Sequence, residues 1–181
     1  SSAPLNPAYR ADEFEFYLSD LDARLLLVEA GRPCPAIEVA QRDGAWQVVR
    51  PSRYERRITA STPCAISGPA AGSDLMKTAR DPGGREALGT FAGCAHGWTP
   101  WGTYLTCEEN FQDRFVNAGT RDALQRRDLI PARSRANWEI ADERFDAARH
   151  PNEPNRFGWV VEIDPYDPTA TPVKRTALGR C

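Results

Sequence analysis

The sequence predicts a mainly β fold that is preceded by a short helix–strand segment. Beyond residue 37, short runs alternate between apolar and polar residues, which is the period of a half-buried strand. Of the 181 residues, 15 are proline and 13 are glycine, and most of these follow Pro63, which favours many turns over long helices. Residues 14–21 differ, because their apolar side chains recur at spacings of three and four.

The N-terminal segment, residues 1–40, is predicted to contain one helix and one strand. Asp12 can cap a helix over residues 11–21. The apolar face of this helix comprises Phe14, Tyr17, Leu18 and Leu21. A strand is expected at residues 24–29, closed by the Gly-Arg-Pro turn that follows it. A helix followed by a strand is typical of α/β proteins, so this segment belongs to a different architecture from the rest.

The remaining chain, residues 41–181, is predicted to consist of short strands and turns. Asp43 and Gly44 separate alternating runs at residues 37–40 and 46–49, and an Asp-Gly pair in this setting indicates a hairpin turn. Further strands are expected at residues 103–107, 158–163 and 173–178. These strands are too few to close a barrel or a full propeller.

Two longer stretches are predicted to be irregular. Residues 62–89 are rich in Gly, Pro, Ala and Ser, and are expected to form a loop with one helical turn at residues 74–79. Residues 113–149 are polar and dense in Arg and Asp, with little core-forming material. They are expected to form a long connection on the protein surface that contains short helical pieces.

Charge and composition exclude several classes of function. A net charge of −2 without a basic stripe or an aromatic platform predicts no nucleic-acid partner. The longest apolar run, residues 25–28, is far too short to span a bilayer, so no membrane partner is expected. Residues 1–7 lack the charged and apolar regions of a signal peptide, although a mature exported protein would look the same. The five cysteines are widely spaced and odd in number, which fits neither a disulfide framework nor a CxxC zinc site.

One cluster of residues suggests chemistry: Cys94, followed by Glu108 and Glu109. Cys94 lies in a glycine-containing loop, and the two acids end a predicted strand, where adjacent side chains point to opposite sides. Carboxylates are the usual ligands of Ca²⁺, and a thiolate adds a softer ligand for iron or zinc. On these residues alone, two solvated acids and a buried cysteine are the more common arrangement.

The beginning of the chain resembles a different family from the rest of the sequence. Residues 4–10, PLNPAYR, and residues 13–21, EFEFYLSDL, are similar to adenylate-forming acyl-CoA synthetases, and the resemblance extends to about Ala40. In that family this stretch is a helix and strand of the large N-terminal domain. The segment contains no Ser/Thr/Gly-rich loop of the kind that binds ATP phosphates, so it carries none of that family's chemistry.

The longer resemblance, over residues 37–180, is to PhoX-type alkaline phosphatases. Its motifs occur in the expected order: DGAWQVVRPS at 43–52, SGPAAG at 67–72, TPWGTYLTCEEN at 99–110, and the run at 150–180 that includes PNEPNRFGW and VVEIDP. The resemblance implies a metal-dependent hydrolase of phosphate monoesters, periplasmic or exported, built as a β-propeller. Its central pocket would hold calcium and iron.

The resemblance also implies which residues bind metal. Cys94 matches the loop cysteine of the family, Glu108 and Glu109 match its acidic pair, with Glu109 favoured as the inward ligand, and Glu162 matches a further glutamate. Such ligands must share one pocket. Gly93 stands where the family usually has Asn, and His96 is expected to be an exposed loop residue. No catalytic residue is assigned.

The chain is expected to be incomplete and to have weak or no activity. About two blades' worth of propeller strands remain, the join between the two resemblances falls at residues 36–41, and the family pattern continues past Cys181 with further acidic motifs. Two alternatives stay open: a non-catalytic β fragment that acts as an interaction or oligomeric module through open sheet edges, and a remnant of an acyl-CoA ligase.

Overall fold

The computed structural model describes residues 39–42, 45–48, 51–54 and 56–177, and the chain divides into two compact units. One unit consists of Ser1–Arg57 and Pro165–Thr169, and the other of Ile58–Asp164 and Ala170–Cys181. The predicted helix at residues 11–21 and the predicted strand at residues 24–29 lie outside the described residues.

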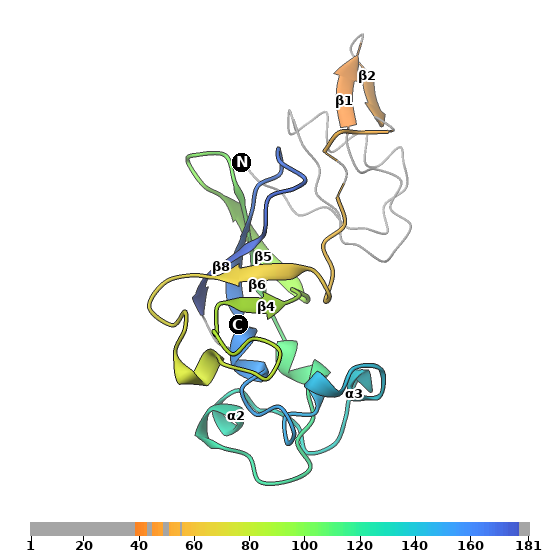
Figure 1. Ribbon diagram of the computed structural model, residues 1–181. Coiled ribbons are helices and arrows are strands. Elements are labelled where there is room, and N and C mark those ends of the chain that lie inside the picture. The colour runs from red at the N-terminus through yellow and green to blue at the C-terminus, as the bar shows by residue number, and fades with distance from the viewer. Residues whose placement is uncertain (1–38, 43–44, 49–50, 55, 178–181) are drawn as a thin grey trace. The chain divides into compact units, whose positions relative to one another are not determined.

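The first unit contains a two-stranded antiparallel hairpin (Figure 1). Strand β1 (Val39–Arg42) pairs with β2 (Ala45–Val48), and the last residue of β1 faces the first residue of β2. Only Asp43 and Gly44 connect these facing positions, so the predicted place of the hairpin is confirmed.

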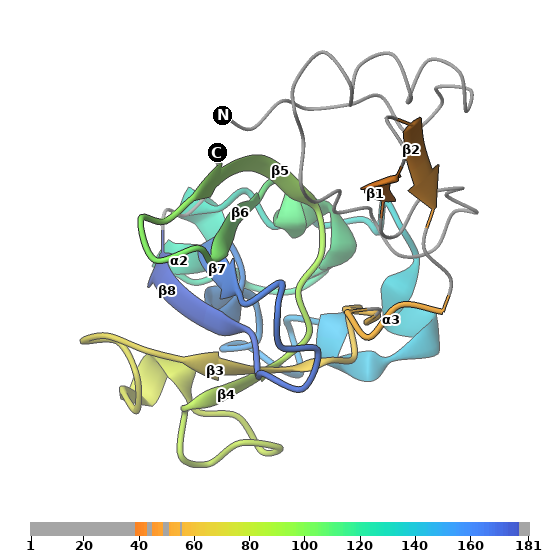
Figure 2. The same cartoon turned by 90° about the horizontal axis from the view of Figure 1, so that it is seen from above.

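The second unit is built on a six-stranded sheet with the order β4-β3-β8-β7-β6-β5. Neighbouring strands are antiparallel except β3 and β8, which run parallel. The strands are β3 (Pro63–Ile66), β4 (Glu86–Leu88), β5 (Gly93–Trp98), β6 (Tyr104–Glu108), β7 (Trp159–Ile163) and β8 (Val173–Ala177). The three strands predicted after residue 100 are therefore confirmed as β6, β7 and β8, and Figure 2 shows them from above.

Short helices occupy the connections, and most lie between β6 and β7. In Figure 1 this connection, with α2 and α3, lies below the strands. The helices are η1 (Asp74–Met76), η2 (Phe111–Arg114), α2 (Ala123–Arg127), α3 (Trp138–Ala141), η3 (Glu143–Phe145) and η4 (Pro154–Arg156). No helix within the described ranges has both the length and the apolar character needed to cross a membrane.

The connection between β6 and β7 contributes a hydrophobic core, which corrects the prediction that residues 113–149 contain little core-forming material. Phe115, Ile130 and Phe145 from this stretch are each at most 3% exposed. They pack with neighbouring buried residues of the same cluster: Phe111, Ala147 and Phe157. These residues are too widely scattered among polar ones to show a periodic pattern, and the segment folds back on itself to gather them.

The stretch at residues 62–89, predicted to be a loop, contributes strands β3 and β4 to the sheet as well as η1. Gly89, which follows β4, adopts a φ of +96°, and a Cβ atom there would lie 1.9 Å from the Ala60 carbonyl oxygen. Only glycine permits both this conformation and this approach of the backbone. The local composition indicated turns, but β3 pairs with β4 at the other end of this stretch and with the distant β8.

Two buried arginines bind the β6–β7 connection to other parts of the unit: Arg144 reaches β4, and Arg156 reaches η1. Arg144 donates from its two terminal nitrogens to the carbonyl oxygens of Leu88 and Ala60, each at 2.7 Å, and to the Glu153 carboxylate at 3.0 Å. Arg156 lies within 3.8 Å of the same Glu153 carboxylate. Because these groups are almost fully buried, their charges are compensated inside the protein rather than by water.

Candidate functional site

Strand register places Glu108 and Glu162 on opposite faces of the sheet. Leu105 of β6 faces Glu162 of β7, so these two side chains share a face. Glu108 lies three residues further along β6 than Leu105, and alternation turns its side chain to the other face. We call the face of Glu108 the core face, since it also carries the buried Val161 and Lys174.

On the core face, Glu108 forms a fully buried ion pair. Its Oε1 atom lies 2.6 Å from Lys174 Nζ, and both side chains are 0% exposed. Its Oε2 atom accepts a hydrogen bond from the backbone N–H of Trp159 at 3.1 Å. The ammonium of Lys174 also lies 4.3 Å from the centre of the Phe157 ring. Both carboxylate oxygens therefore have protein partners, and Glu108 links β6 to β7 and β8.

On the opposite face, Glu162 accepts three hydrogen bonds although it is only 7% exposed. Thr103 Oγ1 donates to Oε1 at 2.5 Å, Trp101 Nε1 donates to Oε1 at 2.8 Å, and Arg175 Nε donates to Oε2 at 2.5 Å. These donors, with the Thr103 hydroxyl the largest contributor, hold the pKa of Glu162 below its usual value, while burial opposes the shift. Glu162 is therefore an ionised, well-paired carboxylate.

Cys94 and Glu109 lie at the far end of the β5–β6 pair from Glu162. Cys94 is exposed, at a register shift in β5 between Gly93 and His96. The backbone N–H of Glu109 donates to the Ala92 carbonyl oxygen at 2.8 Å, which places the half-buried Glu109 beside the start of β5. Glu162 faces a β6 residue four positions before Glu109, about 13 Å away along the strand.

The four predicted ligands do not form an ion site in this arrangement. Over residues 39–42, 45–48, 51–54 and 56–177, no three histidine, cysteine, aspartate or glutamate side chains come close enough to hold a metal ion. Glu108 and Glu162 already have partners on both oxygens. Cys94, Glu108 and Glu109 lie at one end of the β5–β6 pair, but Glu108 is bound to Lys174 and the Trp159 N–H. Cys94 and Glu109 alone are fewer donors than calcium or iron requires.

One other predicted residue differs from expectation. His96 lies on β5 as a half-buried residue whose ring stacks on Tyr104, with centroids 5.9 Å apart, and is not in a loop.

Sequence reasoning missed Lys174 and Arg175, the partners of the two glutamates. Adjacent residues on a strand point to opposite faces, so two consecutive basic residues within β8 place one charge on each face of the sheet. In a chain whose strands also carry acids at Glu108 and Glu162, that pattern indicates a buried pair on one face. Trp101, in the turn between β5 and β6, gave no comparable signal.

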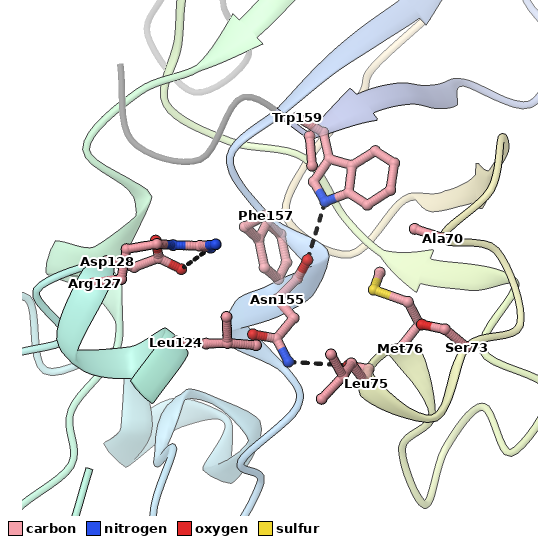
Figure 3. A pocket seen from close by; sticks show the side chains of 11 residues that line it. Ala70, Ser73, Leu75, Met76, Leu124, Arg127, Asp128, Asn155, Phe157 and Trp159 are labelled. Carbon is pink, nitrogen blue, oxygen red and sulfur yellow. Dashed lines mark hydrogen bonds and ion pairs between the residues drawn. The ribbon is translucent and has the colours of Figure 1, made fainter. Parts of the chain in front are cut away.

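A cavity of about 500 Å³ lies beside α2, η1 and the start of β7 (Figure 3). Phe157, Trp159 and Leu124 contribute much of its apolar wall, and Arg127 with Asp128 forms a two-bond ion pair on one side at 2.8 and 3.1 Å. Asn155 donates to the Leu75 carbonyl oxygen and closes another side. The described lining of this cavity includes none of the four predicted metal ligands.

Comparison with known proteins defines the class of the chain. The family described as alkaline phosphatase PhoX matches residues 29–181. The solved structure of Pseudomonas fluorescens PhoX in complex with vanadate, a transition state analogue, is 58% identical, with a TM-score of 0.75. The chain therefore belongs to the PhoX family of alkaline phosphatases.

The matched relatives are longer than this chain. The similarity to the Pseudomonas protein covers 79% of this chain but 25% of that one. An oxalate–CoA ligase of Arabidopsis thaliana is 55% identical over 42 residues, which are 23% of this chain and 8% of the ligase. The acyl-CoA synthetase resemblance of the N-terminal segment rests on this short match.

Proposed function

We propose that this chain is part of a metal-dependent phosphoric monoester hydrolase of the PhoX type. The observation that carries the proposal is its 58% identity, at a TM-score of 0.75, to a PhoX that binds a transition state analogue. Members of the family are metal-dependent phosphatases, and the family match extends over residues 29–181. Phosphate monoesters are accordingly the proposed substrates, and a periplasmic or exported location is proposed with them.

Calcium and iron are the proposed metals, and Cys94, Glu108, Glu109 and Glu162 are the proposed ligands. Cys94 and Glu109 support this most directly, because they share one end of the β5–β6 pair and solvent reaches both. Glu108 and Glu162 would have to exchange Lys174 and Arg175 for an ion. The structure supports no catalytic step by these residues.

We further propose that residues 41–181 form a partial, propeller-like PhoX domain after an acyl-CoA synthetase-like segment at residues 1–40. The six-stranded sheet lies within residues 41–181 and supports the propeller-like part of this proposal, whereas the compact units divide after Arg57. Within that sheet the outermost strands are β4 and β5, whose outer edges are candidate surfaces for self-association. That feature favours the second candidate function, a non-catalytic β module that binds another copy of the chain.

Weak activity of the isolated chain is proposed from the site geometry. Removing one electrostatic group from an active site commonly lowers the rate by about 10²–10³, and here the four ligands do not converge. The test is turnover of p-nitrophenyl phosphate with added Ca²⁺ and iron, together with the metal content of the purified chain.

The Pseudomonas protein serves as the positive reference for that assay, and Glu162→Gln as the variant. Bound metal with slow turnover that Glu162→Gln abolishes would support the hydrolase. A metal-free chain without turnover, found by light scattering as an oligomer, would favour the interaction module. Pyrophosphate release from ATP with a carboxylic acid would instead indicate the ligase remnant.

A further inference from the structure

We propose that the cavity beside α2, η1 and the start of β7 binds a small, uncharged aromatic molecule that carries one N–H or O–H donor. Leu75 and Leu124 form the sides of this site, and the rings of Phe157 and Trp159 form its floor. The Oδ1 atom of Asn155 accepts the hydrogen bond of the ligand. Binding of this kind requires neither a metal ion nor a phosphate group.

The cavity has the size and the floor of a small-molecule site. Its volume of about 500 Å³ falls within the range of about 300–1,000 Å³ that such sites occupy. All of its lining residues belong to the second unit, so one compact body forms it. Phe157 and Trp159 are each 2% exposed, and Trp159 Nε1 donates to the Asn155 carbonyl oxygen at 3.0 Å. These fixed rings offer edge-to-face or offset contacts to the ring of a ligand.

Leu75 and Leu124 give the cavity apolar sides that remain in contact with solvent. Figure 3 shows Leu124 on one side of Asn155 and Leu75 on the other. Leu75 is 55% exposed, and Leu124 is half-buried. An apolar ligand in the cavity would remove part of both side chains from water, and this burial favours binding.

The charged groups of the lining bind each other, which favours an uncharged ligand. Nε and Nη2 of Arg127 donate to the two carboxylate oxygens of Asp128, at 2.8 and 3.1 Å. The Asp128 side chain is only 5% exposed, so its negative charge stays close to the guanidinium. A charged ligand would lose hydration on entering the cavity and would find both of these groups already paired.

Asn155 supplies the polar contact of the site. Its Nδ2 atom donates to the Leu75 carbonyl oxygen at 3.0 Å, which fixes the plane of the amide and leaves Oδ1 as an acceptor. Among the described residues, no donor bonds to this Oδ1 atom, and it is not one of the buried atoms that lack a partner. A ligand in the cavity can therefore reach an oriented acceptor that is otherwise bound by water.

The experiment compares three indoles for binding to the whole chain in EDTA, by ligand-observed NMR titration. Indole is uncharged and has an N–H donor, 1-methylindole lacks the donor, and indole-3-acetate adds a negative charge. We expect indole to bind with a Kd of about 1 mM or lower. 1-Methylindole should bind about fivefold more weakly, because one hydrogen bond is lost. Indole-3-acetate should bind at least about tenfold more weakly than indole.

Two variants locate the site within the chain. Leu124→Trp fills the cavity and should lower the affinity for indole by at least about tenfold. Ile140→Trp is its matched control, since it adds the same side chain at an 80% exposed helical position outside the described lining, and it should bind indole as the original chain does. Asn155→Leu removes the acceptor and should bind indole and 1-methylindole equally. Thermal unfolding shows whether each variant is folded.

Three results would overturn the site: no binding of indole at millimolar concentration, equal affinity of the original chain for indole and 1-methylindole, or unchanged affinity in a folded Leu124→Trp. The comparison of the three indoles uses the original chain, so it decides the matter even where a variant fails to fold. Because the assay contains no metal and no phosphate ester, its failure leaves the hydrolase proposal standing. Absence of p-nitrophenyl phosphate turnover would likewise leave this site standing.

Discussion

Replacing Lys174 by methionine tests whether Glu108 is a structural residue. The substitution removes the ammonium that lies 2.6 Å from Glu108 Oε1 and leaves a carboxylate that is 0% exposed, whose remaining partner among the described residues is the Trp159 N–H. Breaking a buried ion pair in this way costs about 3–5 kcal/mol. The expected result is a fall of about that size in the free energy of unfolding, and of roughly 10–20 °C in Tm.

The measurement is urea unfolding followed by tryptophan fluorescence, with Lys77→Met as the matched control. Lys77 makes an ion pair of similar length, 2.7 Å to Asp74, but with side chains that are 46% and 92% exposed. Exposed pairs contribute about 0–1 kcal/mol, so this control should change stability little. The double variant Glu108→Leu with Lys174→Met should recover most of the loss, because apolar residues of similar volume can replace a buried pair.

Two results would refute this reasoning. A loss below about 1 kcal/mol in Lys174→Met would show that the pair is not buried as described. Recovery of Lys174→Met by added Ca²⁺, without the same effect on the original chain, would show that Glu108 binds a metal ion once its lysine is removed. The second result would also strengthen the proposed ligand role of Glu108.

Three further predictions concern stability. The pKa of Glu162 is lowered from 4.5 in the folded state, so its ionised form contributes stability above about pH 4.5 that is lost as the pH falls through the lowered folded pKa. Urea unfolding of Glu162→Gln should therefore show a lower free energy of unfolding at neutral pH, and this deficit should shrink as the pH falls below 4.5. A pH-independent deficit would contradict this. Gly89→Ala should lower the free energy of unfolding in urea by about 2 kcal/mol or more, because φ is +96° and the new Cβ would lie 1.9 Å from a carbonyl oxygen. Gly97→Ala, whose Cβ would have no atom within 4 Å, should leave it nearly unchanged. Phe115→Ala should lower the free energy of unfolding by about 3–5 kcal/mol, because it leaves a cavity in the core. Ile140→Ala, at an 80% exposed position, should change the free energy of unfolding little. Equal losses in the two variants would show that Phe115 is not part of the core.

The sequence alone determined the local elements that depend on neighbouring residues. Alternation predicted β6, β7 and β8 within one or two residues, and the Asp-Gly pair predicted where the first hairpin turns. Both signals are local, because a strand's two faces and a two-residue turn are specified by consecutive side chains. The motifs at residues 99–110 and 150–180 likewise predicted the PhoX family, which the comparisons bear out.

Tertiary structure decided what depends on residues far apart in the chain. β3 pairs with β8 across more than a hundred residues, so composition alone made residues 62–89 look like a loop. The phenylalanines at 111, 115 and 145 form a core only after the β6–β7 connection folds back. Whether an acid on a strand binds a metal ion or an internal cation depends on the strand beside it. For Glu108 and Glu162 that strand is β8, which supplies Lys174 to one face of the sheet and Arg175 to the other.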